Sequence, residues 1–333
     1  MTDLAAAVAD GDLDALIRLV DGLCSSRDWA RIVELRDRCR HAHEERGLQL
    51  WPAAEYAEYR LALEGSGEFA AGVVTEEAGR FALGPLWEVA ASTHEWSVLA
   101  PHLRPGPARA LAAHERALRG EDLEAETDVD RHVLEIPLRV LDWEPTYSVA
   151  SFRADDADFD ALSPPSFAKI TLPEPGVEID DDESIEALID IGSVWAQQSN
   201  GTATAVAVHG SCEAAVAALG HGRCLLVDTT VADAFARIAW AGASGGAYGK
   251  RRGGPMGRFA AWWLGATLTD LEWPVDPREM ETAVGELRWV LWEPSGFTGG
   301  WSACIAVESP SEGIAWALEA VDSYREEDVL AEA

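Results

Sequence analysis

The segment EDLEAETDVDRHVLEIPLRVL (residues 121–141) separates two different patterns of apolar residues. Before it, from residue 4 to about residue 125, apolar side chains recur at the spacing of amphipathic helices, and runs of β-branched residues are nearly absent. Within it, from Val133 onward, apolar and polar side chains alternate with a period of two, which is typical of a strand. The segment therefore predicts that a helical part of the chain ends here and a part with a sheet begins.

The part before this segment predicts an all-helical domain over residues 1–127. Glycine, serine and proline interrupt the helical pattern at residues 25–26, 47, 65–67, 84–85 and 101–107, which divides it into roughly five to seven short antiparallel helices. No fixed period relates these helices to one another. We therefore expect an irregular helical repeat or bundle.

The part after it, residues 128–333, predicts an α+β domain with a mostly antiparallel sheet. Residues 133–141 and 147–152 read as paired strands, and an acidic loop region follows over about residues 153–183 around a short strand at 167–172. Further strands are expected at 202–209, 224–227, 287–293 and 301–308. Helices are expected at 184–198, 211–219, 230–241, 257–268, 277–286 and, with Ser309 as its N-cap, 310–321. The domain is rich in tryptophan, since nine of the fourteen tryptophans follow residue 190.

Charge and cysteine content restrict the class of protein. With 58 acidic against 26 basic residues, the formal net charge of -32 repels phosphate backbones and anionic lipids, so we expect no nucleic-acid or membrane partner. Five cysteines without a CxxC spacing predict free thiols in a reducing compartment rather than disulfides or a zinc site. Acidic residues near Met1 and the lack of an apolar run of about 20 residues favour a cytoplasmic location.

The outstanding local feature is WAGASGGAYGKRRGGPMGR (residues 240–258), a glycine-rich break between two expected helices. Its amides and cations predict a place for an anion, a phosphate or a carboxylate, with these candidate residues: Gly245, Gly246, Gly249, Lys250, Arg251, Arg252 and Arg258. Acidic side chains of the same chain are the alternative occupants. The spacing matches neither GxxxxGK[ST] nor a strand-following GxGxxG, so no nucleotide or other cofactor is predicted.

Two other residue pairs are candidates. Cys212 lies where a strand should turn into a helix, close in sequence to His209, so a thiol site with this histidine as base is one hypothesis; a small core cysteine is the other. Trp262 and Trp263 are adjacent on an expected helix and point about 100° apart, so one of them is a candidate contact for a partner. We assign no catalytic residue and no metal ligand.

The last third of the chain resembles an actinobacterial family of unknown function. The resemblance rests on GASGGAYGKRRG at 242–253, GRFAAWW at 257–263, Trp292-Glu293 and GIAWALEAVD at 313–322. It extends mainly over residues 200–322 and implies a shared fold, with no activity or catalytic residue attached.

Three functions follow as hypotheses from these patterns. The first is a noncatalytic protein-interaction or scaffold protein, in which the helical domain offers an acidic surface to a partner protein. The second is an enzyme that handles a small molecule or phosphate at the glycine-rich segment. The third is an acidic inhibitor or immunity-type protein that covers a cationic partner.

Overall fold

The computed structural model describes residues 3–75, 79, 82–159, 162–163, 165–297 and 299–323, without the side chains of 43–46. The chain forms two compact units. Unit 1 comprises residues 1–133 and 149–159, and unit 2 comprises residues 134–148 and 160–333. Within the described ranges, none of the helices combines the length and the apolar character needed to cross a bilayer.

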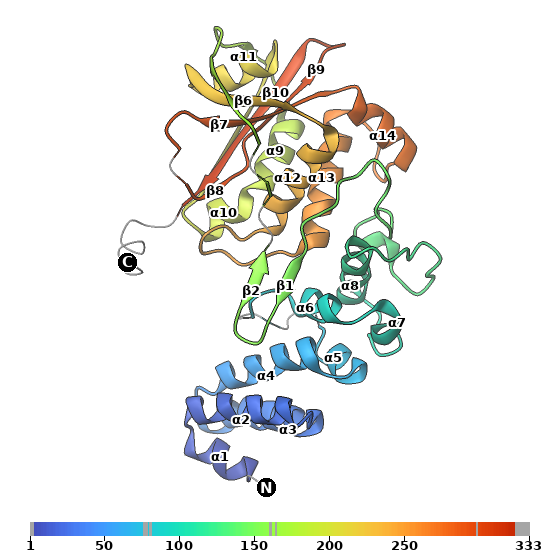
Figure 1. The fold of residues 1–333 in the computed structure, drawn as a ribbon, viewed down its shortest axis with the longest axis vertical. Coiled ribbons are helices and arrows are strands. Elements are labelled where there is room, and N and C mark those ends of the chain that lie inside the picture. Colours follow the sequence, from blue (N-terminus) through green and yellow to red (C-terminus); the bar gives the residue numbers. More distant parts are fainter. Residues whose placement is uncertain are drawn as a thin grey trace. The chain divides into compact units, whose positions relative to one another are not determined.

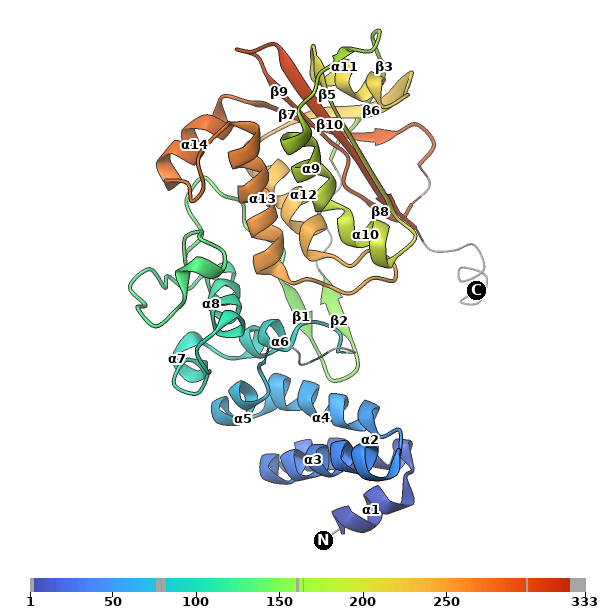
Figure 2. The ribbon, with the colours of Figure 1, turned by 180° about the vertical axis from the view of Figure 1, so that it is seen from behind.

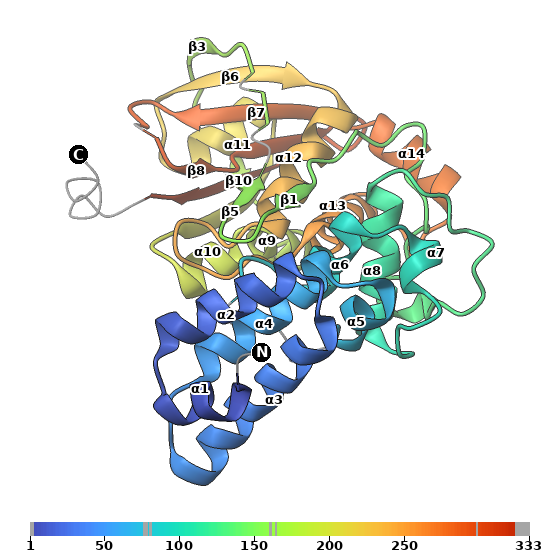
Figure 3. The ribbon, with the colours of Figure 1, turned by 60° about the horizontal axis from the view of Figure 1, so that its bottom comes forward.

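Unit 1 is built from short helices. They are α1 (Leu4–Asp10), α2 (Leu13–Ser25), α3 (Trp29–Arg46), α4 (Trp51–Glu64), α5 (Gly67–Gly72), α6 (Leu86–Thr93), α7 (Trp96–Leu99), α8 (Pro107–Leu118) and a 3-10 turn, η1 (Arg131–Val133). Asp3 and Asp12 cap the first two helices, because each carboxylate accepts a hydrogen bond from a backbone N–H of the first turn. Figure 3 shows α2, α3 and α4 side by side, in mutual contact. The predicted helical N-terminal region is therefore confirmed.

A two-stranded antiparallel ribbon completes unit 1. It consists of β1 (Ala150–Phe152) and β2 (Ala157–Phe159), and Phe152 is opposite Ala157. The expectation that residues 133–141 and 147–152 pair as strands is wrong. Residues 134–141 form no strand, because the carbonyl groups of Pro137 and Arg139 accept side-chain hydrogen bonds instead of entering a ladder.

Unit 2 contains an eight-stranded antiparallel sheet (Figure 1). Its strands are β3 (Ala168–Thr171), β4 (Val177–Glu178), β5 (Thr202–His209), β6 (Arg223–Thr229), β7 (Arg288–Pro294), β8 (Trp301–Ser302), β9 (Ile305–Ser309) and β10 (Ile314–Asp322). The order is β3-β6-β7-β9-β10-β5-β4, and β8 pairs with β10. This sheet and its helices confirm the predicted α+β class with a mostly antiparallel sheet.

Helices cover both faces of the sheet. Against one face lies α11 (Cys212–Ala218), whose alanines and valine pack on Val208, Val290 and Ala306. The other face is covered by α9 (Asp182–Ile191), α10 (Ser193–Gln198) and α12 (Val231–Ala243). Helix α13 (Gly254–Leu268) packs on α9 and α12, and α14 (Pro277–Gly285) packs on α13. Figure 2 shows α9, α12 and α13 lying next to one another.

The closing helix expected at 310–321 is wrong, because Ile314–Asp322 form β10. This stretch contains three alanines, a leucine and a glutamate, which favour a helix. In the fold it pairs with β5 along one side and with β8 and β9 along the other, so its backbone groups are satisfied by the sheet. Ser309, expected as an N-cap, ends β9.

Candidate functional site

The glycine-rich segment forms the connection from α12 to α13, and residues 244–253 are called the glycine loop below. The backbone N–H of Ala247 donates to Oδ2 of Asp322 over 2.6 Å, and the Ser199 hydroxyl donates to the same oxygen over 2.7 Å. Oδ1 of this carboxylate accepts from the N–H of Ser323, and Asp322 is only 2% exposed. The loop therefore binds a carboxylate of its own chain at the end of β10.

The three glycines that the sequence singled out allow this arrangement. Gly246 has a φ of +71°, and a Cβ atom there would overlap Oδ2 of Asp322. At Gly245 a Cβ atom would overlap the backbone of Gly249, because the two ends of the turn touch. These glycines let the loop close on Asp322, which gives them a structural role in the fold.

Arg258, at the start of α13, is completely buried and paired within unit 2. Its Nε and Nη2 donate to the two carboxylate oxygens of Glu144, over 2.8 and 2.6 Å. Its Nη1 donates to the carbonyl of Pro137 and Nη2 donates to that of Arg139, each over 2.7 Å. The structure thus commits this guanidinium to the chain itself, not to a visiting anion.

Glu144 is the centre of a buried group that we call the Glu144 cluster: Glu144, Tyr147, Arg258 and Trp262. The Tyr147 hydroxyl and the Trp262 Nε1–H donate to its Oε2, over 2.6 and 3.0 Å. Burial alone would raise the pKa of Glu144, but the adjacent Arg258 guanidinium and these hydrogen bonds hold it below its ordinary value. The Tyr147, Arg258 and Trp262 side chains therefore stabilise the ionised form of Glu144.

The other cations of the glycine loop differ in exposure. Lys250 is exposed, and its backbone N–H donates to the side-chain oxygen of Gln198 over 3.2 Å. Arg251 and Arg252 are half-buried; burial lowers the pKa of Arg252, while the Asp190 carboxylate opposes that change. The Lys250 backbone amide thus attaches the glycine loop to Gln198 at the end of α10.

The predicted thiol pair is not assembled as a site. Cys212 is fully buried, and its Sγ lies 3.9 Å from the carbonyl oxygen of Arg288. Burial raises the pKa of this thiol, so it stays protonated at neutral pH, opposite to the activation expected at a helix start. His209 is exposed on β5, and among the described residues no hydrogen bond joins it to Cys212. The thiol is thus a core residue.

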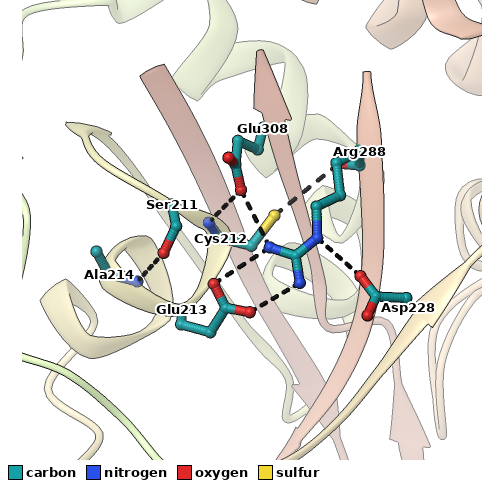
Figure 4. Close-up of polar contacts among 7 residues, drawn as sticks. All are labelled: Ser211, Cys212, Glu213, Ala214, Asp228, Arg288 and Glu308. Atoms are coloured by element: carbon teal, nitrogen blue, oxygen red, sulfur yellow. Dashed lines mark hydrogen bonds and ion pairs between the residues drawn. The ribbon is translucent and has the colours of Figure 1, made fainter. Parts of the chain in front are cut away.

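A cluster that the sequence did not reveal surrounds Arg288, and we call it the Arg288 cluster. As Figure 4 shows, the carboxylates of Glu213, Asp228 and Glu308 surround its guanidinium, at 2.8, 2.7 and 3.1 Å. The hydrogen bonds that Arg288 donates to Glu213 lower the pKa of this carboxyl group to about 2. The register of the sheet places Glu308 of β9 opposite Arg288 of β7 and Asp228 of β6 opposite Val290. The packing of α11 on the sheet adds Glu213.

The two adjacent tryptophans have different surroundings. Trp262 is 1% exposed and belongs to the Glu144 cluster, so it presents no surface to a partner. Trp263 is half-buried, stacks on Phe259 with a centroid distance of 6.2 Å and meets Trp273 edge-on at 5.4 Å. This aromatic group packs the outer side of α13.

Unit 1 contains a pocket of about 880 Å³, which we call the aromatic pocket. It is formed by α2, α4, the residues just before α6 and the β1–β2 turn. Its apolar and aromatic lining comprises Ile17, Trp51, Pro52, Tyr56, Tyr59 and Leu83. No sequence signal marked it, because its residues are spread over more than a hundred positions.

Polar groups in this pocket are arranged around Asp21. The Tyr56 hydroxyl donates to its Oδ1 over 2.7 Å, and the Arg60 guanidinium also donates to that oxygen. The Tyr59 hydroxyl donates to the carbonyl of Arg153, and burial raises the pKa of Tyr59 to about 12. Burial also raises the pKa of Tyr56. Both tyrosines therefore stay neutral at physiological pH, and their hydroxyl groups donate hydrogen bonds.

A second, smaller pocket of about 350 Å³ lies in unit 2 between α9, α13, α14 and the β9–β10 turn. Acids and hydroxyl groups line it, and the Trp316 indole donates to Asp181 Oδ2 over 2.7 Å at its wall. Among the described residues, no three His, Cys, Asp or Glu side chains are placed to hold a metal ion.

A family model described as "Family of unknown function (DUF6183)" matches residues 14–324, so the similarity extends through the helical half as well as the last third. No curated protein and no solved structure matches the chain.

Proposed function

We propose that this chain, which belongs to the family of unknown function DUF6183, is a noncatalytic protein-interaction protein that binds its partner in the aromatic pocket. One observation carries the proposal: unit 1 has a hollow of about 880 Å³ with aromatic and apolar walls. The residues that contribute most to binding in protein interfaces are enriched in tryptophan and tyrosine. We place this activity in the cytoplasm, since the five cysteines are free thiols.

The other candidate sites favour binding over chemistry. The amides of the glycine loop hold Asp322, and Arg258 is neutralised by Glu144, so a phosphate would have to displace an internal carboxylate in either place. The Cys212 thiol is buried and protonated at neutral pH. The Ala247 amide, Arg258 and Cys212 are thus engaged within the fold, which supports binding over chemistry.

The proposal is tested by selecting peptides from a random display library on the full chain and measuring their affinities for two variants. Leu83 and Val98 are each 42% exposed, but only Leu83 lines the pocket. Leu83→Ala is expected to weaken the selected peptides several-fold, because it removes apolar contact area. The matched control Val98→Ala is expected to leave their affinity unchanged. Equal affinities for both variants would count against the aromatic pocket as the binding site.

A further inference from the structure

The charges of the aromatic pocket indicate the chemistry of its partner, an argument that rests on the proposed function. Three acidic residues line the pocket, Asp21, Glu55 and Asp155. Among its described lining residues Arg60 is the one base, and it is ion-paired with Asp21 and, over 2.8 Å, with Glu64. The field inside the pocket is therefore negative, as it is for the chain as a whole with its net charge of -32.

Arg60 shows how a guanidinium is held in this pocket. Its Cζ lies 5.5 Å from the centroid of the Tyr56 ring, over the ring face. At the same time its Nη1 donates to Asp21, which also accepts the Tyr56 hydroxyl. An aromatic face next to a carboxylate is a favourable place for a second cation with an aliphatic stem.

The apolar rim indicates a protein segment as the occupant. Trp51 and Leu83 line the pocket and are 37% and 42% exposed, so apolar surface continues beyond the hollow. A single amino acid or small amine would leave this rim uncovered, whereas a segment with apolar residues beside a basic one covers both. We infer that the partner is a basic protein segment that places an arginine or lysine near the carboxylates of Asp21 and Asp155 and its apolar neighbours on Trp51 and Leu83.

The experiment has two arms. In the first, a random heptapeptide display library is selected on the full chain and counter-selected on Ala82→Trp, which puts an indole where a methyl group lines the pocket. In the second, one selected peptide is compared by calorimetry with the same peptide in which citrulline replaces arginine, or norleucine replaces lysine. Both peptides are measured on wild type, on Asp155→Asn and on a matched control, Asp10→Asn, whose side chain is exposed on α1 outside the pocket. Thermal unfolding checks that each variant is folded.

The inference predicts that selected peptides are enriched in arginine or lysine and that the neutral analogue binds about tenfold more weakly. Asp155→Asn is expected to weaken only the basic peptide, and Asp10→Asn to weaken neither. If pocket-dependent peptides lack basic residues, or the neutral analogue binds equally well, the inference fails while the proposed function stands. If N-acetylarginine amide binds as tightly as the peptide, the occupant is a small cation and the inference fails. If no peptide depends on the pocket, both proposals fail.

Discussion

A buried carboxylate needs donors within reach, and Asp322 obtains two of its three from residues far away in the chain. Ser199, Ala247 and Ser323 each donate to it, and no cation is among these three donors. Backbone N–H groups can carry this role because each one provides a partner to an acceptor that burial would otherwise leave without a hydrogen bond. At the residue scale the glycine loop thus resembles an anion site whose anion is internal.

The close approach of Gly246 to Asp322 makes a sharp prediction. Gly246→Ala adds both a strained φ of +71° and an overlap with the carboxylate, whereas Gly313→Ala adds a similar φ of +67° with nothing within 4 Å. We expect the control to cost about 1 kcal/mol of unfolding free energy and Gly246→Ala to cost about 1–3 kcal/mol more. Urea unfolding followed by tryptophan fluorescence measures both; equal losses would show that the overlap is relieved at no cost.

The Glu144 cluster is tested by a double-mutant cycle. Glu144→Gln leaves the Arg258 charge buried without its partner, so we expect a loss of about 3–5 kcal/mol. Arg258→Met leaves the Glu144 carboxylate buried without its cation, so we expect a similar loss of unfolding free energy. The double variant Glu144→Gln/Arg258→Met should cost less than the sum of the two single variants, because no charge stays buried alone. Additive losses in urea unfolding would contradict an ion pair that the fold depends on.

At the scale of elements, the Arg288 cluster fastens the first turn of α11 to three strands. The guanidinium bonds to Glu213 of α11, and Glu308 of β9 also accepts the N–H of Cys212. Helix α11 is seven residues long, too short to be stable by itself. Its position therefore depends on its apolar face and on this cluster.

The Glu213 carboxylate makes this attachment sensitive to acid. Its pKa is about 4.5 in the absence of the fold and about 2 within it, so the stability it contributes is full above about 4.5 and is lost as pH falls toward 2. We expect the urea midpoint of Glu213→Gln to change less than that of wild type over this interval. Glu281→Gln, on an exposed part of α14, is the control and should follow wild type. If the urea midpoint of Glu213→Gln depends on pH as strongly as that of wild type, Glu213 does not contribute to the acid sensitivity.

The local residue pattern predicted the type of an element correctly where the tertiary pairing favoured the same type, and failed where it did not. The apolar pattern of the sequence predicted both β5 and α12. Side chains on one face recur every two residues in a strand and every 3.6 residues in a helix, so the two patterns can be told apart. The β10 stretch has helix-forming residues but lies between β5 and β9, where only an extended chain satisfies both neighbours. Tertiary pairing therefore overrode local preference in this element.

At the scale of the whole molecule, the excess of acidic residues dominates. With a formal net charge of -32, the acidic side chains of the folded chain repel one another. At 0.1 M salt the Debye length is about 10 Å, so repulsion between exposed charges farther apart than this is largely screened. We expect the thermal unfolding midpoint to rise by a few degrees as NaCl increases from about 0.01 to 0.2 M and then to level off. A midpoint that stays constant or falls in this range would show that surface ion pairs outweigh the repulsion.

The sequence by itself determined the succession of a helical part and an α+β part, most helix and strand positions, and the unusual glycine loop. These features depend on neighbours within about ten residues, whose spacing and backbone preferences are visible in the chain. Only the tertiary structure decided that Asp322 occupies the loop, that Glu144 neutralises Arg258 and that Asp21, Tyr56 and Asp155 share a pocket. Each of these joins residues separated by more than thirty positions, and a single sequence carries no information about which distant side chains meet.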